Sequence, residues 1–218
     1  KNAYHGNTMG SMSVMGFEER KQVFRPLIPD VDFITFNNEA DLEKITEKTA
    51  GIILESIQGG AGFIQPENGF LKKVKQRCEA VGALMIVDEI QPGFGRTGKL
   101  MGFENYDVVP DVIILGKGMG GGMPVGAFVA KAEYMDLLSH DPKLGHITTF
   151  GGHPVIAAAC LATLKEITET KLIPQTLEKE KLFRSLLVHP LLTEIRGKGL
   201  MLAAMTADPE ITNQVIFK

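Results

Sequence analysis

Two side chains of opposite charge stand directly after apolar runs, where they could act on one ligand. Lys117 lies between Gly116 and Gly118, and these glycines allow a ligand to approach the backbone closely. A lysine amine that is neutral in a crevice can form an imine with a carbonyl compound, although a lysine between glycines is also typical of a solvated turn. Asp88 ends the other run. A buried acid there requires a partner, which could be a cation, a helix N-terminus or the protonated nitrogen of an electron-withdrawing pyridine ring.

The runs that precede these two residues predict neighbouring strands. Residues 83–87 and 111–115 are short, rich in β-branched residues and bounded by turn signals, as is typical of strands buried on both faces of a parallel sheet. Ligands bind outside the carboxyl ends of such strands. We therefore expect Asp88 and Lys117 to project into one crevice, with Gln91 close enough to hydrogen-bond an oxygen on the ring.

Composition argues against several classes of protein. The 218 residues carry a formal charge of −3, which leaves no basic stripe for binding nucleic acid. No apolar run approaches the roughly 18 residues that span a bilayer, so we expect no membrane partner. Cys78 and Cys160 are too few and too far apart for a disulfide framework or a zinc site, and we expect no metal. Reduced thiols and no secretory signal favour a cytoplasmic protein.

Strand and helix patterns alternate up to Lys117, which predicts an α/β fold. Residues 51–56 form an apolar run typical of a strand, and residues 67–82 carry an apolar stripe at helical spacing. The other elements expected here are a helix within 8–16 with Thr8 as its N-cap, a surface loop at 17–30, a strand at 31–36 and an exposed helix at 39–48.

Beyond Lys117 the pattern changes. Only residues 116–124 separate the strand expected at 111–115 from the apolar run at 125–130. A crossover between parallel strands needs about a dozen residues or more. If these strands are neighbours, they must be antiparallel. We expect the large domain to cover 1–165, and an interdomain helix with the start of a small domain to cover 166–218. The remaining expected elements are helices at 131–139, 154–166 and 177–187 and a kinked strand at 194–204.

Two glycine-rich segments invite a phosphate-binding interpretation. Residues 116–121 match G-x-G-x-x-G, but a dinucleotide fingerprint opens a helix, whereas here Pro124 and another strand-like run follow. Thr148 and Thr149 precede two glycines and a helix. Such a helix start could bind an anion or could simply be capped.

The ordered set of motifs resembles the class III aminotransferases of the ornithine and acetylornithine type, which are pyridoxal-phosphate enzymes of fold type I. The resemblance covers nearly the whole chain, and the set is specific although each motif alone is weak. It implies a large domain with a mostly parallel sheet, one antiparallel strand and helices on both faces, plus the start of a small α+β domain. The motifs are Tyr4-His5-Gly6, Asp88-Glu89-Ile90-Gln91, Gly93-Phe94-Gly95-Arg96-Thr97-Gly98, Leu115-Gly116-Lys117-Gly118, Thr148-Thr149-Phe150-Gly151-Gly152 and Arg196-Gly197-Lys198-Gly199-Leu200.

The resemblance also implies roles for individual residues. Lys117 would form the Schiff base with pyridoxal 5'-phosphate and move the substrate proton, and Asp88 would pair with the pyridinium nitrogen; these two would be catalytic. Gln91 would touch the phenolic oxygen. The other positions carried over are Tyr4, which would stack on the ring, Glu55, which would support the cofactor, Thr149, which would reach the cofactor phosphate of the partner subunit in a homodimer, and Thr148 and Asn7, which would lie at the substrate.

Two positions depart from the ornithine and acetylornithine enzymes. Asn7 replaces an arginine that clamps a carboxylate, and Gly60 replaces a glutamate that gates an arginine in the ornithine enzymes. The substrate therefore need not be ornithine. The chain starts at Lys1 without a methionine and resembles a fragment that lacks the N-terminal part and the C-terminal end of the family. We expect it to hold the cofactor poorly by itself.

The resulting expectation is a transaminase that moves an amino group from an amino acid or amine to a 2-oxo acid. Such ping-pong chemistry requires a covalent intermediate and a dimer that completes each site. Cofactor residues do not determine which bond breaks, so a racemase, an aminomutase or a decarboxylase on the same scaffold is an alternative. A nucleotide-binding module and an inactive scaffold are more distant alternatives.

Overall fold

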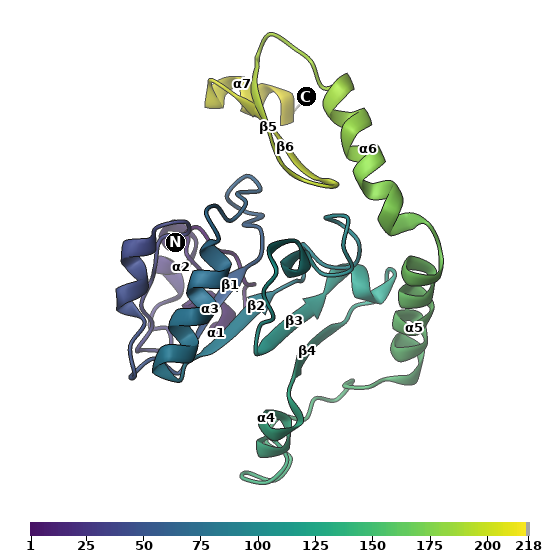
Figure 1. Ribbon diagram of the computed structural model, residues 1–218. Helices are drawn as coiled ribbons and strands as arrows, with labels where there is room; N and C mark the ends of the chain where they lie inside the picture. Colours follow the sequence, from purple (N-terminus) through teal and green to yellow (C-terminus); the bar gives the residue numbers. More distant parts are fainter. Residues whose placement is uncertain (217–218) are drawn as a thin grey trace.

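A four-stranded sheet lies at the centre of the first two thirds of the chain (Figure 1). The computed structural model describes residues 1–216. Strands β1 (Gly51–Glu55), β2 (Leu84–Asp88), β3 (Val112–Gly116) and β4 (Gly126–Ala130) follow one another across the sheet in chain order. The first three are parallel, and β4 is antiparallel to β3. The predicted α/β fold, with a mostly parallel sheet, one reversed strand and helices around it, is confirmed.

The reversal of β4 follows from the short connection that precedes it. Between β3 and β4 the chain makes only the 3₁₀ helix η4 (Lys117–Gly120) and a turn in which Met123 N donates to Gly120 O at 3.0 Å. A connection of this length cannot return the chain to the end of the sheet at which the parallel strands begin. Gly116 consequently pairs with Gly126, as the sequence predicted for neighbouring strands.

Helix α3 (Phe70–Val81) packs against β2 and supplies much of the core. Gly69 and Gly82 flank it in the left-handed conformation, which glycine adopts without steric cost. The helix confirms the apolar stripe predicted at 67–82. Its buried side chains, Phe70, Leu71, Val74 and Cys78, join Leu54, Met85 and Val87 of the strands in one cluster. Burial of this kind contributes about 1.5–3 kcal/mol for each large side chain, so it holds the strand ends firmly.

The predictions of a strand at 31–36 and of a helix at 39–48 are wrong. Residues 31–36 form no strand, because their backbone groups bond elsewhere: Thr35 N donates to the Asp41 carboxylate at 2.7 Å, and the Lys1 amino group donates to Ile34 O. In place of a helix over 39–48, the 3₁₀ helix η2 (Glu39–Lys44) follows Asn38, whose side chain accepts a bond from Ala40 N. Local side-chain hydrogen bonds of this kind compete with regular structure.

Short helical turns surround the sheet near the start of the chain. Helix α1 (Met9–Ser13) begins after Thr8, as predicted, and Thr8 N donates to the Ser11 hydroxyl at 3.1 Å. The segment expected to be a loop at 17–30 contains helix α2 (Glu18–Lys21) and the 3₁₀ helix η1 (Gln22–Phe24). A further 3₁₀ helix, η3 (Gly102–Tyr106), lies between β2 and β3.

The last third of the chain leaves the four-stranded sheet and ends in a separate two-stranded sheet (Figure 1). Helices α4 (Ala132–Leu137), α5 (Pro154–Glu169) and α6 (Leu172–Leu186) confirm the three expected helices, with α6 starting earlier than predicted. The expected kinked strand at 194–204 is instead a hairpin of β5 (Leu192–Lys198) and β6 (Met201–Thr206), followed by α7 (Pro209–Ile216). Gly197 and Gly199 have positive φ angles at its turn, which reverse the chain where a kink was expected.

The expected division into residues 1–165 and 166–218 stays a prediction. The two separate sheets, β1–β4 and β5–β6, are compatible with it. Within residues 1–216, no helix has the length and apolarity needed to cross a membrane.

Candidate active site

The parallel strands bring three chemically active side chains to one edge of the sheet. Glu55 and Asp88 are direct partners at the carboxyl ends of β1 and β2, and Asp88 in turn pairs with Ile114 of β3. Lys117 follows the end of β3 directly. This edge is where open α/β sheets bind ligands.

Lys117 opens into a cavity of about 300 Å³. Its φ of +42° is left-handed, which is uncommon for a residue other than glycine and indicates backbone strain at a site of interest. The lysine is exposed in this structure, not enclosed as its expected crevice would require. We call this space the Lys117 cavity; it is lined by Phe63, Ile90, Gln91, Gly93, Arg96, Lys117, Gly118, Leu200 and Met201.

Asp88 is buried beneath this edge and is held by two donors. Its Oδ2 lies 2.8 Å from Nδ1 of His5, and its Oδ1 accepts a bond from Ile90 N at 3.0 Å. Because a carboxylate only accepts hydrogen bonds, Nδ1 of His5 carries the proton. Nε2 of His5 is buried without a partner among residues 1–216. The sequence assigned no role to His5, whose only signal was the Tyr4-His5-Gly6 motif.

Glu55 anchors the segment that contains Tyr4. One carboxylate oxygen accepts a bond from Tyr4 N at 3.1 Å, and the other accepts from Gly59 N at 3.0 Å. Burial raises the pKa of Glu55, and these two backbone donors oppose that rise. Glu55 therefore holds backbone on both sides of the site, in keeping with the supporting role that the resemblance implied.

Gln91 lies in the Lys117 cavity, as predicted, and packs against Gly59. A Cβ atom at Gly59 would collide with Oε1 of Gln91, so only glycine leaves room for the amide in this orientation. Gln91 and Lys117 therefore line the same space. Asp88 does not line that space directly but ends the adjacent strand.

Glu89 is a functional candidate that the sequence interpretation missed. Its side chain is fully buried, and it accepts bonds from Gly102 N and from Phe103 N, the latter at 3.1 Å. Burial raises the pKa of Glu89 to about 7, against these backbone hydrogen bonds. Glu89 thereby ties the end of β2 to η3 and closes the loop that carries Gln91 and Arg96. A second acid directly after a buried strand was the available signal.

Arg96 is a second missed residue and adds a cation to the cavity. Within residues 1–216 no ion pair involves its guanidinium. Its backbone carbonyl accepts a bond from Leu200 N at 2.8 Å, so it also contacts the β5–β6 hairpin.

Thr148, Thr149 and Asn7 lie apart from the Lys117 cavity. All three are exposed and none of them lines it. Their expected contacts with substrate, or with the cofactor of a partner subunit, stay predictions.

The glycines at 116–121 do not form a dinucleotide loop. They lead into the 3₁₀ helix η4 and then into the reversed strand β4, and no α-helix opens there. The fingerprint requires a helix N-terminus at the phosphate, so the nucleotide-binding alternative lacks its structural basis.

The fold of this chain is shared with solved aminotransferases. The ornithine aminotransferase of Toxoplasma gondii, whose structure shows partial occupancy of PLP at the active site, superposes with a TM-score of 0.85 at 33% identity. The match covers 92% of this chain and 48% of that one. The fold is that of the fold type I aminotransferases.

Sequence comparison identifies the family. The model for Aminotransferase class-III matches residues 1–218, so the chain belongs to the class III aminotransferase family. The [LysW]-aminoadipate semialdehyde/glutamate semialdehyde transaminase of Sulfolobus acidocaldarius is 42% identical over 93% of this chain and 53% of the relative. The acetylornithine aminotransferase of Methanopyrus kandleri is 39% identical over 95% and 53% respectively. The chain spans about half the length of these relatives.

Proposed function

We propose that the protein containing this chain is a pyridoxal-phosphate-dependent aminotransferase that moves an amino group from an amino acid or amine to a 2-oxo acid. Family membership supports the reaction type, and the curated relatives described above are transaminases. The observation that carries the proposal is the position of Lys117 at the carboxyl edge of β3, facing a cavity shared with Gln91 and adjacent to buried Asp88.

The residues present fit the cofactor chemically. Pyridoxal phosphate requires an amine for its aldehyde, an anion for its ring nitrogen and a polar group for its phenolic oxygen, and Lys117, Asp88 and Gln91 supply these. His5 and Ile90 N orient the Asp88 carboxylate, which therefore presents a fixed acceptor. When bound, the cofactor withdraws electrons from the substrate α-carbon.

The chain's own residues would then perform distinct tasks. Lys117 holds the cofactor and moves the proton of the substrate α-carbon through Nζ, as a general base and acid. Tyr4, whose backbone is fixed by Glu55, would stack on the ring. Arg96 is the cation in the cavity to which a substrate carboxylate could bind.

We also propose a cytoplasmic homodimer with shared active sites. The exposed positions of Thr148 and Thr149, outside the Lys117 cavity, support contacts across subunits, including that of Thr149 with the partner's cofactor phosphate. Asn7 and Thr148 would contribute to the substrate region of the complete site. Free Cys78 and Cys160 are consistent with a reducing compartment.

The test is covalent trapping of the cofactor on the full-length protein. After incubation with pyridoxal 5'-phosphate and borohydride reduction, peptide mass spectrometry should find the pyridoxyl group on Lys117. The Lys117→Ala variant should lose this modification and transamination, whereas Lys99→Ala, which changes another exposed lysine, should retain both. Modification elsewhere, or full activity without Lys117, would disprove the assignment.

The competing reactions on the same scaffold require a separate measurement. Products should be analysed with and without a 2-oxo acid acceptor. Without acceptor a transaminase stops after about one equivalent of donor per active site, because its second half-reaction requires the 2-oxo acid. Continued turnover of a single substrate without acceptor would indicate a racemase, an aminomutase or a decarboxylase.

A further inference from the structure

One wall of the Lys117 cavity comes from the β5–β6 hairpin. Leu200 and Met201, at the turn between β5 and β6, line the cavity together with Phe63 and Ile90. The turn lies close against the loop after β2, since Leu200 N donates to Arg96 O at 2.8 Å and a Cβ atom at Gly199 would collide with the same carbonyl. The position of this turn therefore sets the shape of the cavity.

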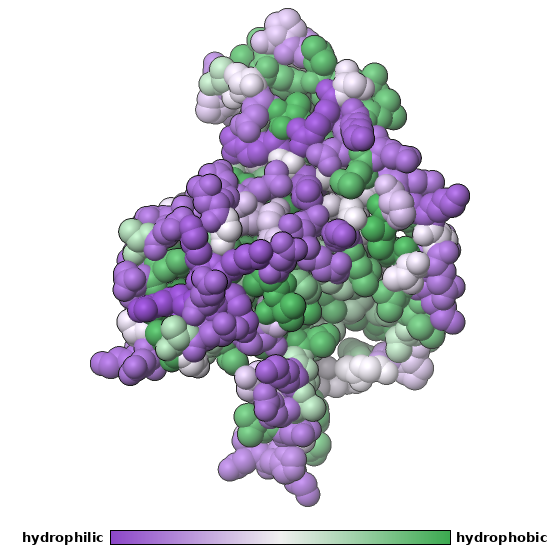
Figure 2. All heavy atoms as spheres, viewed as in Figure 1, coloured by the Kyte–Doolittle hydropathy of each residue, from purple (hydrophilic) through white to green (hydrophobic). Residues whose placement is uncertain are grey.

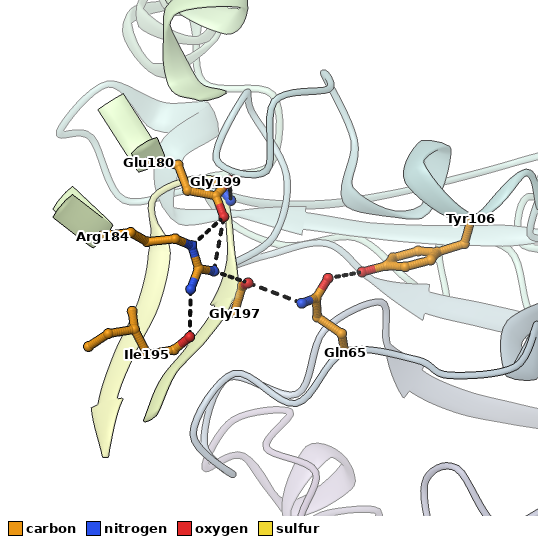
Figure 3. Close-up of polar contacts among 7 residues, drawn as sticks. All are labelled: Gln65, Tyr106, Glu180, Arg184, Ile195, Gly197 and Gly199. Atoms are coloured by element: carbon orange, nitrogen blue, oxygen red, sulfur yellow. Dashed lines mark hydrogen bonds and ion pairs between the residues drawn. The ribbon is translucent and has the colours of Figure 1, made fainter. Parts of the chain in front are cut away.

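An ion pair on α6 holds the turn from behind (Figure 3). Arg184 donates to Ile195 O at 2.5 Å and to Gly197 O at 2.8 Å through the two ends of its guanidinium. Glu180 accepts from Arg184 Nε at 2.9 Å and from Gly199 N at 2.7 Å. The two side chains thus bind the end of β5 and the turn that follows it, and charge-assisted bonds of this type are stronger than neutral ones.

The same turn is held from the other side by Gln65, in the loop after β1, and by Tyr106 of η3. Gln65 donates to Gly197 O at 3.0 Å, and the Tyr106 hydroxyl donates to Gln65 at 3.4 Å, so that Gly197 O accepts bonds from both Gln65 and Arg184 (Figure 3). Burial raises the pKa of Tyr106, which keeps its hydroxyl protonated as a donor. The turn is consequently clamped between α6 and the loop after β1.

The partial burial of the pair distinguishes it from an ordinary surface ion pair. The Glu180 side chain is only 17% exposed, and each of its oxygens has a donor. Arg196 on the same hairpin offers a comparison, because its side chain is about as exposed as that of Arg184 (32% against 35%). Within residues 1–216, however, its guanidinium donates hydrogen bonds only to Glu194 and to no carbonyl of the turn.

We propose that Glu180 and Arg184 are positioning residues that fix Leu200 and Met201 as an apolar wall, and that this wall selects amino donors by the length of their hydrocarbon chain. The inference rests on the proposed aminotransferase function. Phe63, Ile90, Leu200 and Met201 provide the apolar part of the lining, and Lys117 and Gln91 line the same space. A donor would place its amine at Lys117 and its aliphatic portion against the wall.

The experiment uses the full-length, cofactor-loaded protein with Arg184→Gln, Glu180→Gln and the matched control Arg196→Gln. Straight-chain 2-amino acids from alanine to norleucine serve as donors. In the unaltered protein and in the control, each added methylene should raise kcat/KM by up to about fourfold. In both test variants this chain-length dependence should flatten, while the rate with alanine and the absorbance of the bound cofactor change less than about twofold.

Hydrogen exchange provides a readout that needs neither cofactor nor turnover. The amides of Gly199 and Leu200 should exchange at least about tenfold faster in the two test variants and unchanged in Arg196→Gln, because only the former lose contacts to the turn. Equal exchange in all proteins would overturn the positioning role. Faster exchange with an unaltered chain-length dependence would overturn the selection role.

The two proposals fail in distinguishable ways. If the unaltered full-length protein shows no transamination, the proposed function and donor selection fall together, and exchange still decides whether the pair positions the turn. If a test variant loses its native far-UV circular dichroism, the other variant decides the question, since Glu180→Gln keeps the shape of the side chain.

Discussion

Asp88 is held by partners that come from very different places in the chain. His5 lies 83 residues away, whereas the Ile90 amide is only two residues further on. The buried Nε2 of His5 has no partner within residues 1–216, which places an unsatisfied polar group next to the acid that would bind the cofactor ring. A buried polar pair of this kind orients the acid at a cost in stability, as is common at functional sites.

Glu89 yields a prediction at the level of a single residue. Its pKa of about 7 in the folded chain exceeds the ordinary value of 4.5, so between these pH values the folded state binds more protons than the unfolded state. Stability from this group is therefore present below about pH 4.5 and is lost as the pH rises to about 7, by roughly 2–4 kcal/mol in total. At pH 5 the Glu89→Gln variant should be less stable than the unaltered protein, because the amide NH2 group cannot accept the backbone hydrogen bond that a carboxyl oxygen of Glu89 accepts.

Urea unfolding at pH 5, 6, 7 and 8 measures this effect. The difference in free energy of unfolding between the unaltered protein and Glu89→Gln should shrink as the pH rises, because only the former has an acid to ionise. Glu104→Gln, an exposed acid in η3, serves as the control. A difference that stays constant across the range would refute the raised pKa.

At the scale of elements, the packing of α5 against η4 positions the backbone of Lys117. Gly121 is left-handed with a φ of +56°, and a Cβ atom there would collide with Oγ1 of Thr163 on α5. Gly122 has a φ of +102°, but a Cβ atom there meets open space. Substitution at either glycine strains the backbone, but only substitution at Gly121 also creates a steric collision. Comparing the two positions therefore distinguishes the collision from the strain.

Gly121→Ala should destabilise the protein by about 2–4 kcal/mol, from left-handed strain and collision together. Adding Thr163→Ala should recover about 1 kcal/mol or more of this loss, because it removes the colliding hydroxyl. The same second change should not rescue Gly122→Ala. Urea midpoints of the single and double variants give the comparison, and equal rescue of both glycine variants would contradict the packing described here.

Helices and strands with a strong local sequence pattern were predictable. Segments whose conformation depends on hydrogen bonds to residues elsewhere in the chain were not. The stripe of α3 and the short connection before β4 predicted a helix and a reversed strand, both confirmed. Residues 31–36 carry a strand-like pattern, but Asp41 and the Lys1 amino group bind their backbone and no strand forms. The hairpin at 192–206 was read as one strand because glycine turns resemble kinks in the sequence.

At the scale of the whole molecule, apolar side chains remain exposed over the second half of the chain. Figure 2 shows an apolar surface around the region where Figure 1 places β4 and α5. Patches of this kind mark contact surfaces or aggregation sites. The exposed residues include Phe128, Val129, Phe150, Val155, Leu161, Leu186 and Val188.

Residues 1–218 expressed alone should therefore associate and should bind the cofactor weakly. Compared with the full-length protein, we expect more light scattering, stronger fluorescence of a dye that binds apolar surface, and a dissociation constant for pyridoxal 5'-phosphate raised at least about tenfold. The physical reason is that large apolar side chains remain exposed over β4 and α5, in a chain that spans about half the length of its relatives. A monodisperse 218-residue chain with stoichiometric, stable cofactor absorbance would contradict this expectation.

The sequence by itself determined the strand ends that carry Asp88 and Lys117, because apolar runs, glycines and connection length act over a few neighbouring residues. It also predicted Gln91 in the same space as Lys117. Only the tertiary structure decided that His5 binds Asp88, that Glu89 ties β2 to η3, and that Leu200 and Met201 close one side of the cavity. These contacts join residues that are distant in the chain, and packing and hydrogen bonding between such residues leave no periodic signal in the order of the amino acids.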